Sequence, residues 1–168
     1  MDFTHDALIA RAASWLTGST NCSVVITDMV TGHETPDAIG FSSSGMVALI
    51  ECKASRADFF ADARKPHRIH PERGMGGHRW YMTPVGLVSL DELPDRWGLL
   101  EVTPNTVKQV VKAQYWRDRN HRGEVNLLVS AMRRIGNRKV KGVSVKVYTY
   151  YDNKKSKSTL GILVDEDE

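Results

Sequence analysis

The chain has 168 residues, of which 41% are hydrophobic and 26% are charged, values typical of a globular domain and unlike a disordered or fibrous protein. The two cysteines, Cys22 and Cys52, are too few for a disulfide-rich scaffold or a four-cysteine zinc site. No stretch reaches the ~18 apolar residues of a membrane helix, and the first residues lack the basic start of a signal peptide. We therefore expect a cytoplasmic protein that makes no membrane contact.

The net charge of +3 conceals an uneven distribution of charge along the chain. Residues 105–157 contain 14 lysines and arginines against three acidic residues. A region of one sign favours an anionic partner, and nucleic acid is favoured over membrane because no lipid-binding amphipathic stretch accompanies the charge. The alternative is a solvated, lysine-rich surface that only keeps the protein soluble.

The first half of the chain predicts a helix followed by three strands. Apolar residues at helical spacing predict a helix over 3–16, which Gly18 ends. Strands are expected at 23–30, 37–41 and 46–53, and the run Ser-Ser-Ser-Gly at 42–45 predicts a hairpin turn between the last two. Residues 46–53 are apolar on both faces until the end of the run, which is typical of a central strand.

The second half predicts a helix that Ser55 and Asp58 cap and that ends before Pro66. Further elements are strands at 79–83, 98–102 and 107–113, a helix over about 125–135, and a hairpin from 143–151 and 159–164 before an acidic tail. This order predicts one α/β domain over 1–168, with a central mixed sheet flanked by helices. Its core is expected at about 3–103, and a basic C-terminal extension at about 104–168.

Two predicted strands bring together side chains that can perform chemistry. Asp37 opens one strand, and Glu51 and Lys53 close the next. Because side chains alternate along a strand, Glu51 and Lys53 share a face and Cys52 points to the other. A hairpin turn at 42–45 would place Asp37 beside Glu51.

Neighbouring carboxylates repel each other, so such a cluster is best explained by a divalent cation, and Mg²⁺ suits carboxylates together with phosphate oxygens. Lys53 could then orient or deprotonate an attacking water. The alternative is that Asp37 ends a turn and that Glu51 and Lys53 form a surface ion pair.

These residues carry a resemblance to a known superfamily. Pro36-Asp37 followed by Glu51-Cys52-Lys53 and a capped helix resembles the PD-(D/E)xK nucleases. The run from Ile50 to Phe59, with Asp62 and Lys65 after it, is similar to the MmcB-type DNA-repair branch and related phage and bacterial proteins, where the pattern reads ExKxSxxDFxxDxK. The resemblance covers roughly residues 3–136. It implies a restriction-endonuclease-like αβββαβ core and a metal-dependent DNA nuclease in DNA repair or phage DNA processing, located in a bacterial or host cytoplasm.

The resemblance also implies roles for particular residues. Asp37 and Glu51 would hold Mg²⁺, for which Mn²⁺ can substitute, together with the backbone carbonyl of Cys52, and Lys53 would assist the water. Asp28 matches the additional acidic residue that the superfamily often supplies, although a glutamate is more usual there. Glu34 could also supply a ligand, but a carboxylate in a loop is more often solvated.

Basic side chains are the candidate contacts to DNA. Arg56 follows Lys53 at a helix start, where free N–H groups also attract phosphate. The expected partner is DNA, held mainly through its phosphates, and two copies of the chain as a homodimer could cut both strands. The candidate nucleic-acid-binding residues are Arg56, Lys65, Arg79, Arg133 and Arg134.

Other interpretations of the sequence remain. His67, His70 and His78 have ligand-like spacing, but a fourth ligand is missing and Pro66 and Pro71 are expected to break any helix there, so zinc is not favoured. A nuclease-fold DNA-binding or repair-accessory protein with weak or no cleavage is the main alternative to an active nuclease. A third is a factor that acts through protein contacts at its C-terminal hairpin and acidic tail.

Overall fold

The computed structural model describes residues 3–30 and 34–135. The chain divides into two compact units, Met1–Val125 and Asn126–Glu168. The first unit is an α/β structure with a mixed sheet flanked by helices, which confirms the predicted fold class. The C-terminal hairpin predicted within 143–164 lies outside the described residues. Among the described helices, none is long and apolar enough to cross a membrane.

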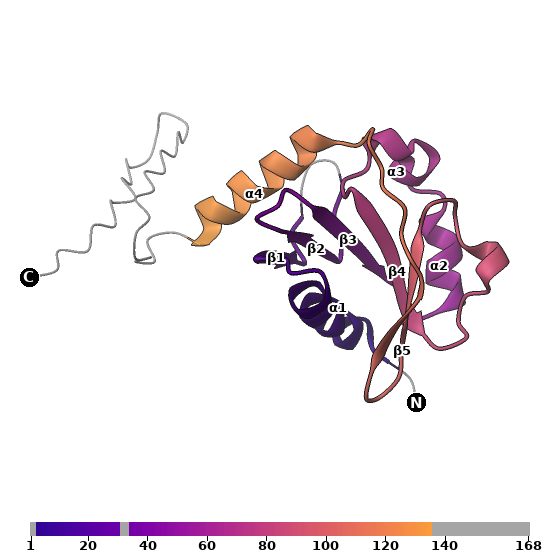
Figure 1. The fold of residues 1–168 in the computed structure, drawn as a ribbon. Helices are drawn as coiled ribbons and strands as arrows, with labels where there is room; N and C mark the ends of the chain where they lie inside the picture. The colour runs from indigo at the N-terminus through magenta and orange to yellow at the C-terminus, as the bar shows by residue number, and fades with distance from the viewer. Residues whose placement is uncertain (1–2, 31–33, 136–168) are drawn as a thin grey trace, which may run out of the picture. The chain divides into compact units, whose positions relative to one another are not determined.

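Six strands form the sheet in the order of the sequence (Figure 1). The β1/β2, β2/β3 and β5/β6 pairs are antiparallel, and β3, β4 and β5 are parallel to one another. Every residue of β3 is buried, as its apolar sequence predicted for a central strand. The strands are β1 (Val24–Thr27), β2 (Ala38–Phe41), β3 (Val47–Cys52), β4 (His78–Pro84), β5 (Gly98–Val102) and β6 (Val107–Val111).

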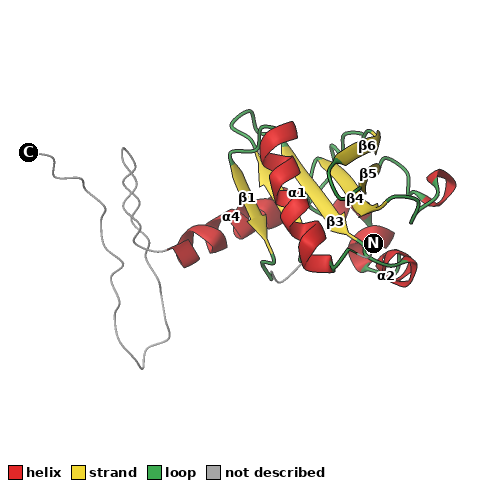
Figure 2. Cartoon of the chain, turned by 90° about the horizontal axis from the view of Figure 1, so that it is seen from below, coloured by secondary structure: helices red, strands yellow, loops and turns green. Residues whose placement is uncertain are grey.

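Helix α1 (His5–Ser19) lies across one face of the sheet, as Figure 2 shows. It begins at Thr4, whose hydroxyl accepts a hydrogen bond from the Ala7 N–H at 3.2 Å. Its buried side chains, among them Leu8 and Leu16, pack with inward-facing strand residues in the main hydrophobic core. Cys52 belongs to that core, so its neighbour Glu51 points to the opposite face of the sheet.

That opposite face is covered by helix α2 (Arg56–Asp62), which Ser55 caps as predicted. Phe59 of α2 packs edge-to-face on Tyr81 of β4, with ring centroids 5.0 Å apart. Tyr81 is also the register partner of Glu51 in the parallel β3/β4 pair. Helix α2 therefore lies over the part of the sheet that carries Glu51.

The expectation that Pro66 and Pro71 break any helix between them is wrong. Pro66 begins the short helix α3 (Pro66–Ile69), and Pro71 begins the 3₁₀ turn η1 (Pro71–Arg73). Proline suits the first turn of a helix because its missing N–H has no partner there and its fixed φ is already helical. A second 3₁₀ turn, η2 (Leu90–Glu92), and the helix α4 (His121–Ile135) complete the described elements.

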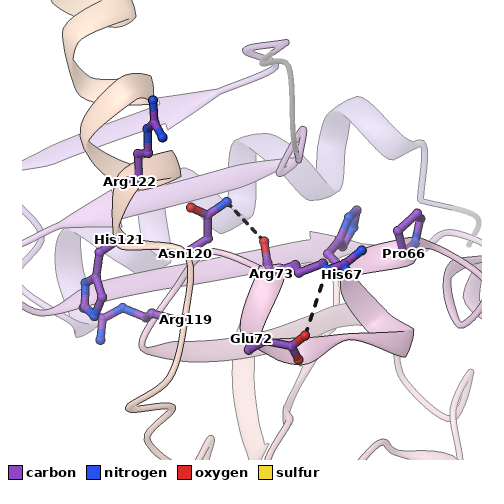
Figure 3. Close-up of a pocket in the computed structure, with 8 residues that line it drawn as sticks. All are labelled: Pro66, His67, Glu72, Arg73, Arg119, Asn120, His121 and Arg122. Carbon is purple, nitrogen blue, oxygen red and sulfur yellow. Dashed lines mark hydrogen bonds and ion pairs between the residues drawn. The ribbon is translucent and has the colours of Figure 1, made fainter.

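A glycine-rich loop connects η1 to β4. Gly76 in this loop has φ +85°, and a Cβ added there would lie 2.6 Å from Cβ of Leu49 in β3. The loop therefore turns sharply against β3 at a point where only glycine fits. Next to it opens a pocket of about 620 Å³ (Figure 3). It is lined by Pro66, His67, Glu72, Arg73 and residues 119–122.

Candidate active site

The β2–β3 hairpin brings Asp37 to the end of β3. The pairing of Ala38 with Ile50 sets the register, and Asp37 Oδ2 accepts a hydrogen bond from the Cys52 N–H at 2.7 Å. His5 Nε2 lies 3.4 Å from the same oxygen. Burial, and then the negative charge of Glu51, raise the pKa of Asp37 above its usual value. The register of the hairpin thus sets Asp37 across from the end of β3 that carries Glu51.

Glu51 and Lys53 share a face of β3 and are both buried, which excludes the alternative of a surface ion pair. Lys53 Nζ lies 3.0 Å from Glu51 Oε2 and 3.2 Å from Asp62 Oδ1. Burial lowers the pKa of Lys53, but the two carboxylates outweigh burial, and the net pKa is raised. Lys53 is therefore a positively charged hydrogen-bond donor and is unsuited to act as a general base.

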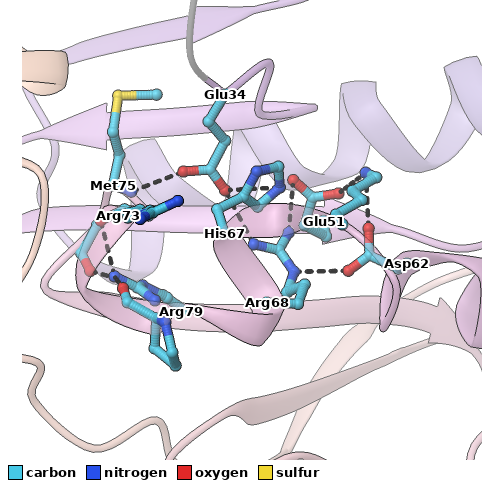
Figure 4. Close-up of polar contacts among 12 residues, drawn as sticks. Glu34, Glu51, Asp62, His67, Arg68, Arg73, Met75 and Arg79 are labelled. Carbon is cyan, nitrogen blue, oxygen red and sulfur yellow. Dashed lines mark hydrogen bonds and ion pairs between the residues drawn. The ribbon is translucent and has the colours of Figure 1, made fainter.

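Glu51 and Lys53 belong to a larger set of mostly buried charges, here called the charge cluster. Figure 4 shows its members Glu34, Glu51, Asp62 and Arg68. The cluster contains three carboxylates and three basic groups in direct contact. Lys65 Nζ lies 2.6 Å from Asp62 Oδ1 and 3.4 Å from Glu51 Oε2. The Tyr81 hydroxyl donates to Asp62 Oδ2 at 2.7 Å. The members of the cluster are Glu34, Glu51, Lys53, Asp62, Lys65 and Arg68.

Arg68 of α3 connects all three carboxylates of the cluster. Its guanidinium nitrogens lie 2.9 Å from Glu34, 3.1 Å from Glu51 and 2.6 Å from Asp62. The guanidinium also stacks on Trp97, 4.5 Å from the ring centroid. Burial would lower the pKa of Arg68, but the surrounding carboxylates raise it, so the group is permanently charged. Arg68 is the central positive charge of the cluster.

Asp62 makes the stability of the fold depend on pH. Burial would raise its pKa, but Arg68 and Lys53 lower the pKa strongly, to well below the unfolded value of about 3.9. Ionised Asp62 therefore stabilises the folded state at pH above about 4, and this contribution is lost as the pH falls below that value. In acid titrations followed by circular dichroism, Asp62→Asn should be less stable than wild type at pH 7, and the difference should shrink toward pH 2. A difference that stays constant with pH would contradict this role.

Of the residues predicted to bind a metal, Asp37, Glu51 and Cys52 lie at the end of β3, whereas the Asp28 side chain is exposed beyond the end of β1. Among residues 3–30 and 34–135, no group of three or more His, Cys, Asp and Glu side chains is placed to hold a metal ion. Asp28 is exposed at the end of β1 with φ +53°, and its N–H lies 3.4 Å from the Asp37 carbonyl oxygen.

The remaining donors are the carboxylates of Asp37 and Glu51 and the carbonyl of Cys52, which match Mg²⁺ in kind. Burial, and after it the charge of Glu51, raises the pKa of Asp37, and a cation bound beside Asp37 would offset both effects. Glu51, in contrast, already contacts three basic groups. A metal bound to Glu51 would share this carboxylate with them.

Arg79 was predicted to contact nucleic acid, and the structure contradicts this. Its side chain is fully buried and donates hydrogen bonds to the carbonyl oxygens of Gly76, Pro71 and Gly74. Burial lowers the pKa of Arg79 to about 10. Because its donors hold the glycine-rich loop against β4, Arg79 has a structural role.

The other candidate contacts differ in their availability. Arg56 is half-exposed but pairs with Glu92 at 2.5 Å and donates to the Leu87 carbonyl. Lys65 is occupied within the charge cluster, although its side chain is 41% exposed. In the second unit, Arg133 and Arg134 are exposed in the last described turn of α4. These two arginines are the exposed candidates that make no ion pair within the described part of the chain.

Sequence reasoning missed two members of the charge cluster. The sequence does not single out Arg68, because it lies in α3, between two prolines that predict a break in any helix there. Glu34 was expected to be solvated, but it is 2% exposed and accepts a hydrogen bond from the Met75 N–H at 2.6 Å. Neither residue stands in the ExKxSxxDFxxDxK pattern. A signal for Arg68 was its place three residues after Lys65, on the helix that follows the pattern.

Comparison with known proteins supports the fold and assigns no activity. No family model matches the chain, and no curated protein matches it significantly. A solved structure, the SPO1766 protein of unknown function from Silicibacter pomeroyi, superposes with a TM-score of 0.60 at 25% sequence identity. The match covers 80% of this chain and 91% of that chain. The chain is thus similar over most of its length to a protein of unknown function.

Proposed function

We propose that this protein is a metal-dependent nuclease of the PD-(D/E)xK type that hydrolyses phosphodiester bonds in DNA. The observation that carries the proposal is the meeting of Asp37, Glu51 and Lys53 at the end of β3, where Asp37 bonds the Cys52 N–H and Lys53 bonds Glu51. Burying charged side chains costs free energy, so charged residues at the end of a buried strand favour a functional role for that position. The run from Glu51 to Phe59, with Asp62 after it, supports the same proposal through its resemblance to DNA-repair nucleases, although Arg64 stands where the pattern has its last lysine.

In this proposal Asp37, Glu51 and the Cys52 carbonyl hold Mg²⁺, which when bound supplies Lewis-acid activation of water and offsets charge on the phosphate. The Lys53 ammonium donates a hydrogen bond to the attacking water and keeps it oriented. Lys65, which is partly exposed, offers positive charge to the phosphate oxygens. Water adds to phosphorus, the bond to the leaving oxygen breaks, and the proton of the water passes to solvent while the leaving oxygen takes a proton.

A second candidate is a nuclease-fold DNA-binding or repair-accessory protein without cleavage activity. The observation that favours it is the charge balance around Glu51. Both of its carboxylate oxygens face basic groups, namely Lys53 and Lys65 on one side and Arg68 on the other. A carboxylate compensated in this way can serve as a structural ion pair and need not hold a metal.

A cleavage assay separates the two candidates. Labelled single-stranded, duplex and flap DNA, and RNA of the same sequence, are incubated with the full chain in Mg²⁺, in Mn²⁺ and in EDTA. The nuclease proposal expects products with either metal and none in EDTA, and the substrate that is cut names the preference. Binding to DNA without products on any substrate would favour the accessory protein.

A further inference from the structure

The pocket beside the glycine-rich loop is strongly basic. Arg73, Arg119 and Arg122 line it, against Glu72 as the one acidic lining residue (Figure 3). Arg122 is exposed and makes no ion pair with any residue that the structure describes. The Arg73 side chain is 67% exposed, and its Nε lies 4.0 Å from Glu72 Oε1. Two guanidinium groups therefore reach the pocket without a close anionic partner.

One wall of the pocket is held in place by hydrogen bonds around the Arg119–Glu124 ion pair. The Arg119 side chain is 6% exposed, and it donates to Glu124 at 2.8 Å and to the Tyr115 hydroxyl at 3.1 Å. Glu124 in turn accepts a hydrogen bond from the Gly76 N–H at 2.9 Å. The pocket wall is thus bonded to the glycine-rich loop. The first turn of α4 at the pocket adds the positive end of a helix dipole.

The pocket is connected to the charge cluster through His67. His67 lines the pocket, and its Nε2 lies 3.4 Å from Glu34 Oε1. Glu34 is bridged by Arg68 to Glu51. Three contacts in series, His67 to Glu34, Glu34 to Arg68 and Arg68 to Glu51, therefore connect the pocket wall to the carboxylate on which the proposed function rests.

We infer that this pocket binds a phosphate group of the nucleic-acid strand and so positions that strand relative to Glu51. Guanidinium groups pair with phosphate oxygens through two parallel hydrogen bonds, and a pocket wall already held by hydrogen bonds reduces the entropy lost on binding. The inference deepens the proposed function and rests on it. It adds Arg73 and Arg122 as phosphate contacts, neither of which belongs to the sequence pattern.

The test measures binding separately from cleavage. Fluorescence anisotropy in EDTA follows the full-length protein with one oligonucleotide that carries either a 5′-phosphate or a 5′-hydroxyl. Arg122→Ala should raise Kd about tenfold and lower the slope of log Kd against log salt by about 1, because one phosphate contact is lost. The double variant Arg73→Ala, Arg122→Ala should weaken binding further. If wild type prefers the 5′-phosphorylated oligonucleotide and Arg122→Ala does not, the pocket binds a terminal phosphate. If Arg122→Ala loses the same affinity for the 5′-phosphorylated and the 5′-hydroxyl oligonucleotide, the pocket binds a backbone phosphate.

The matched control is Arg117→Ala, which removes the same charge from an exposed arginine outside the pocket. It should change Kd by less than about twofold. Equal effects of Arg122→Ala and Arg117→Ala, or no effect of either, would overturn the inference. If only the proposed nuclease function is wrong, the result differs. The wild type would then cut no substrate, but Arg122→Ala would still bind DNA more weakly than Arg117→Ala.

Discussion

Replacing Arg68 with methionine should destabilise the folded protein by about 3–5 kcal/mol, the usual cost of removing one partner from a buried ion pair. The reason is that Glu34, Glu51 and Asp62 would lose the cation that contacts all three of them. Methionine keeps most of the packing volume, so the loss reports charge and not a cavity. The measurement is urea denaturation followed by circular dichroism at neutral pH.

Two controls show whether the effect comes from charge. Arg64→Met removes an exposed arginine that makes no ion pair within the described part of the chain, and it should change stability by less than about 0.5 kcal/mol. The cost of Arg68→Met should also fall at acidic pH, because protonated carboxyl groups need no cation. If Arg68→Met were within about 1 kcal/mol of wild type, the charge cluster would not depend on Arg68 as we describe.

Asp37→Asn should lower the single-turnover cleavage rate by about a thousandfold or more, since it removes one of the two carboxylates proposed to hold the metal. The variant should still fold, because the asparagine carbonyl oxygen can accept the hydrogen bond from the Cys52 N–H that Asp37 accepts. It should also lose little affinity for DNA. This makes Asp37 a cleaner target than Glu51, whose replacement leaves three basic groups without their carboxylate.

The matched control for this experiment is Asp91→Asn, an exposed carboxylate in η2 that makes no ion pair within the described residues. It should cut DNA at the wild-type rate. Retention of wild-type cleavage by Asp37→Asn would remove Asp37 from the proposed metal site. A loss of cleavage accompanied by a loss of folding would shift the assignment of Asp37 from chemistry to structure.

Local patterns in the sequence were sufficient for much of the fold. The hairpin from 37 to 53 followed from two apolar runs separated by a serine-glycine turn, and its register brings Asp37 to the Cys52 N–H at the end of β3. The cap at Ser55 followed from its spacing to Asp58. In these cases the residues that decide the structure are near one another in the chain.

The errors arose where burial and long-range pairing decide the structure. Arg79 resembles a phosphate contact in sequence, but its position in β4 turns it toward three loop carbonyls. Glu34 stands in a loop, yet it is buried because Arg68 and the Met75 N–H satisfy it. Arg68 itself meets partners 6, 17 and 34 residues away in the chain. A local pattern carries no information about such contacts.

The most direct test of the central claim is a calorimetric titration of the full-length protein with Mg²⁺ and Mn²⁺, beside Asp37→Asn. The claim is that Asp37 and Glu51 form a metal site although basic groups surround Glu51. It predicts saturable binding of metal to wild type and loss of that binding in Asp37→Asn, with both proteins folded. A folded wild type that binds neither metal would contradict it and leave the charge cluster as a structural network in a protein that does not cleave.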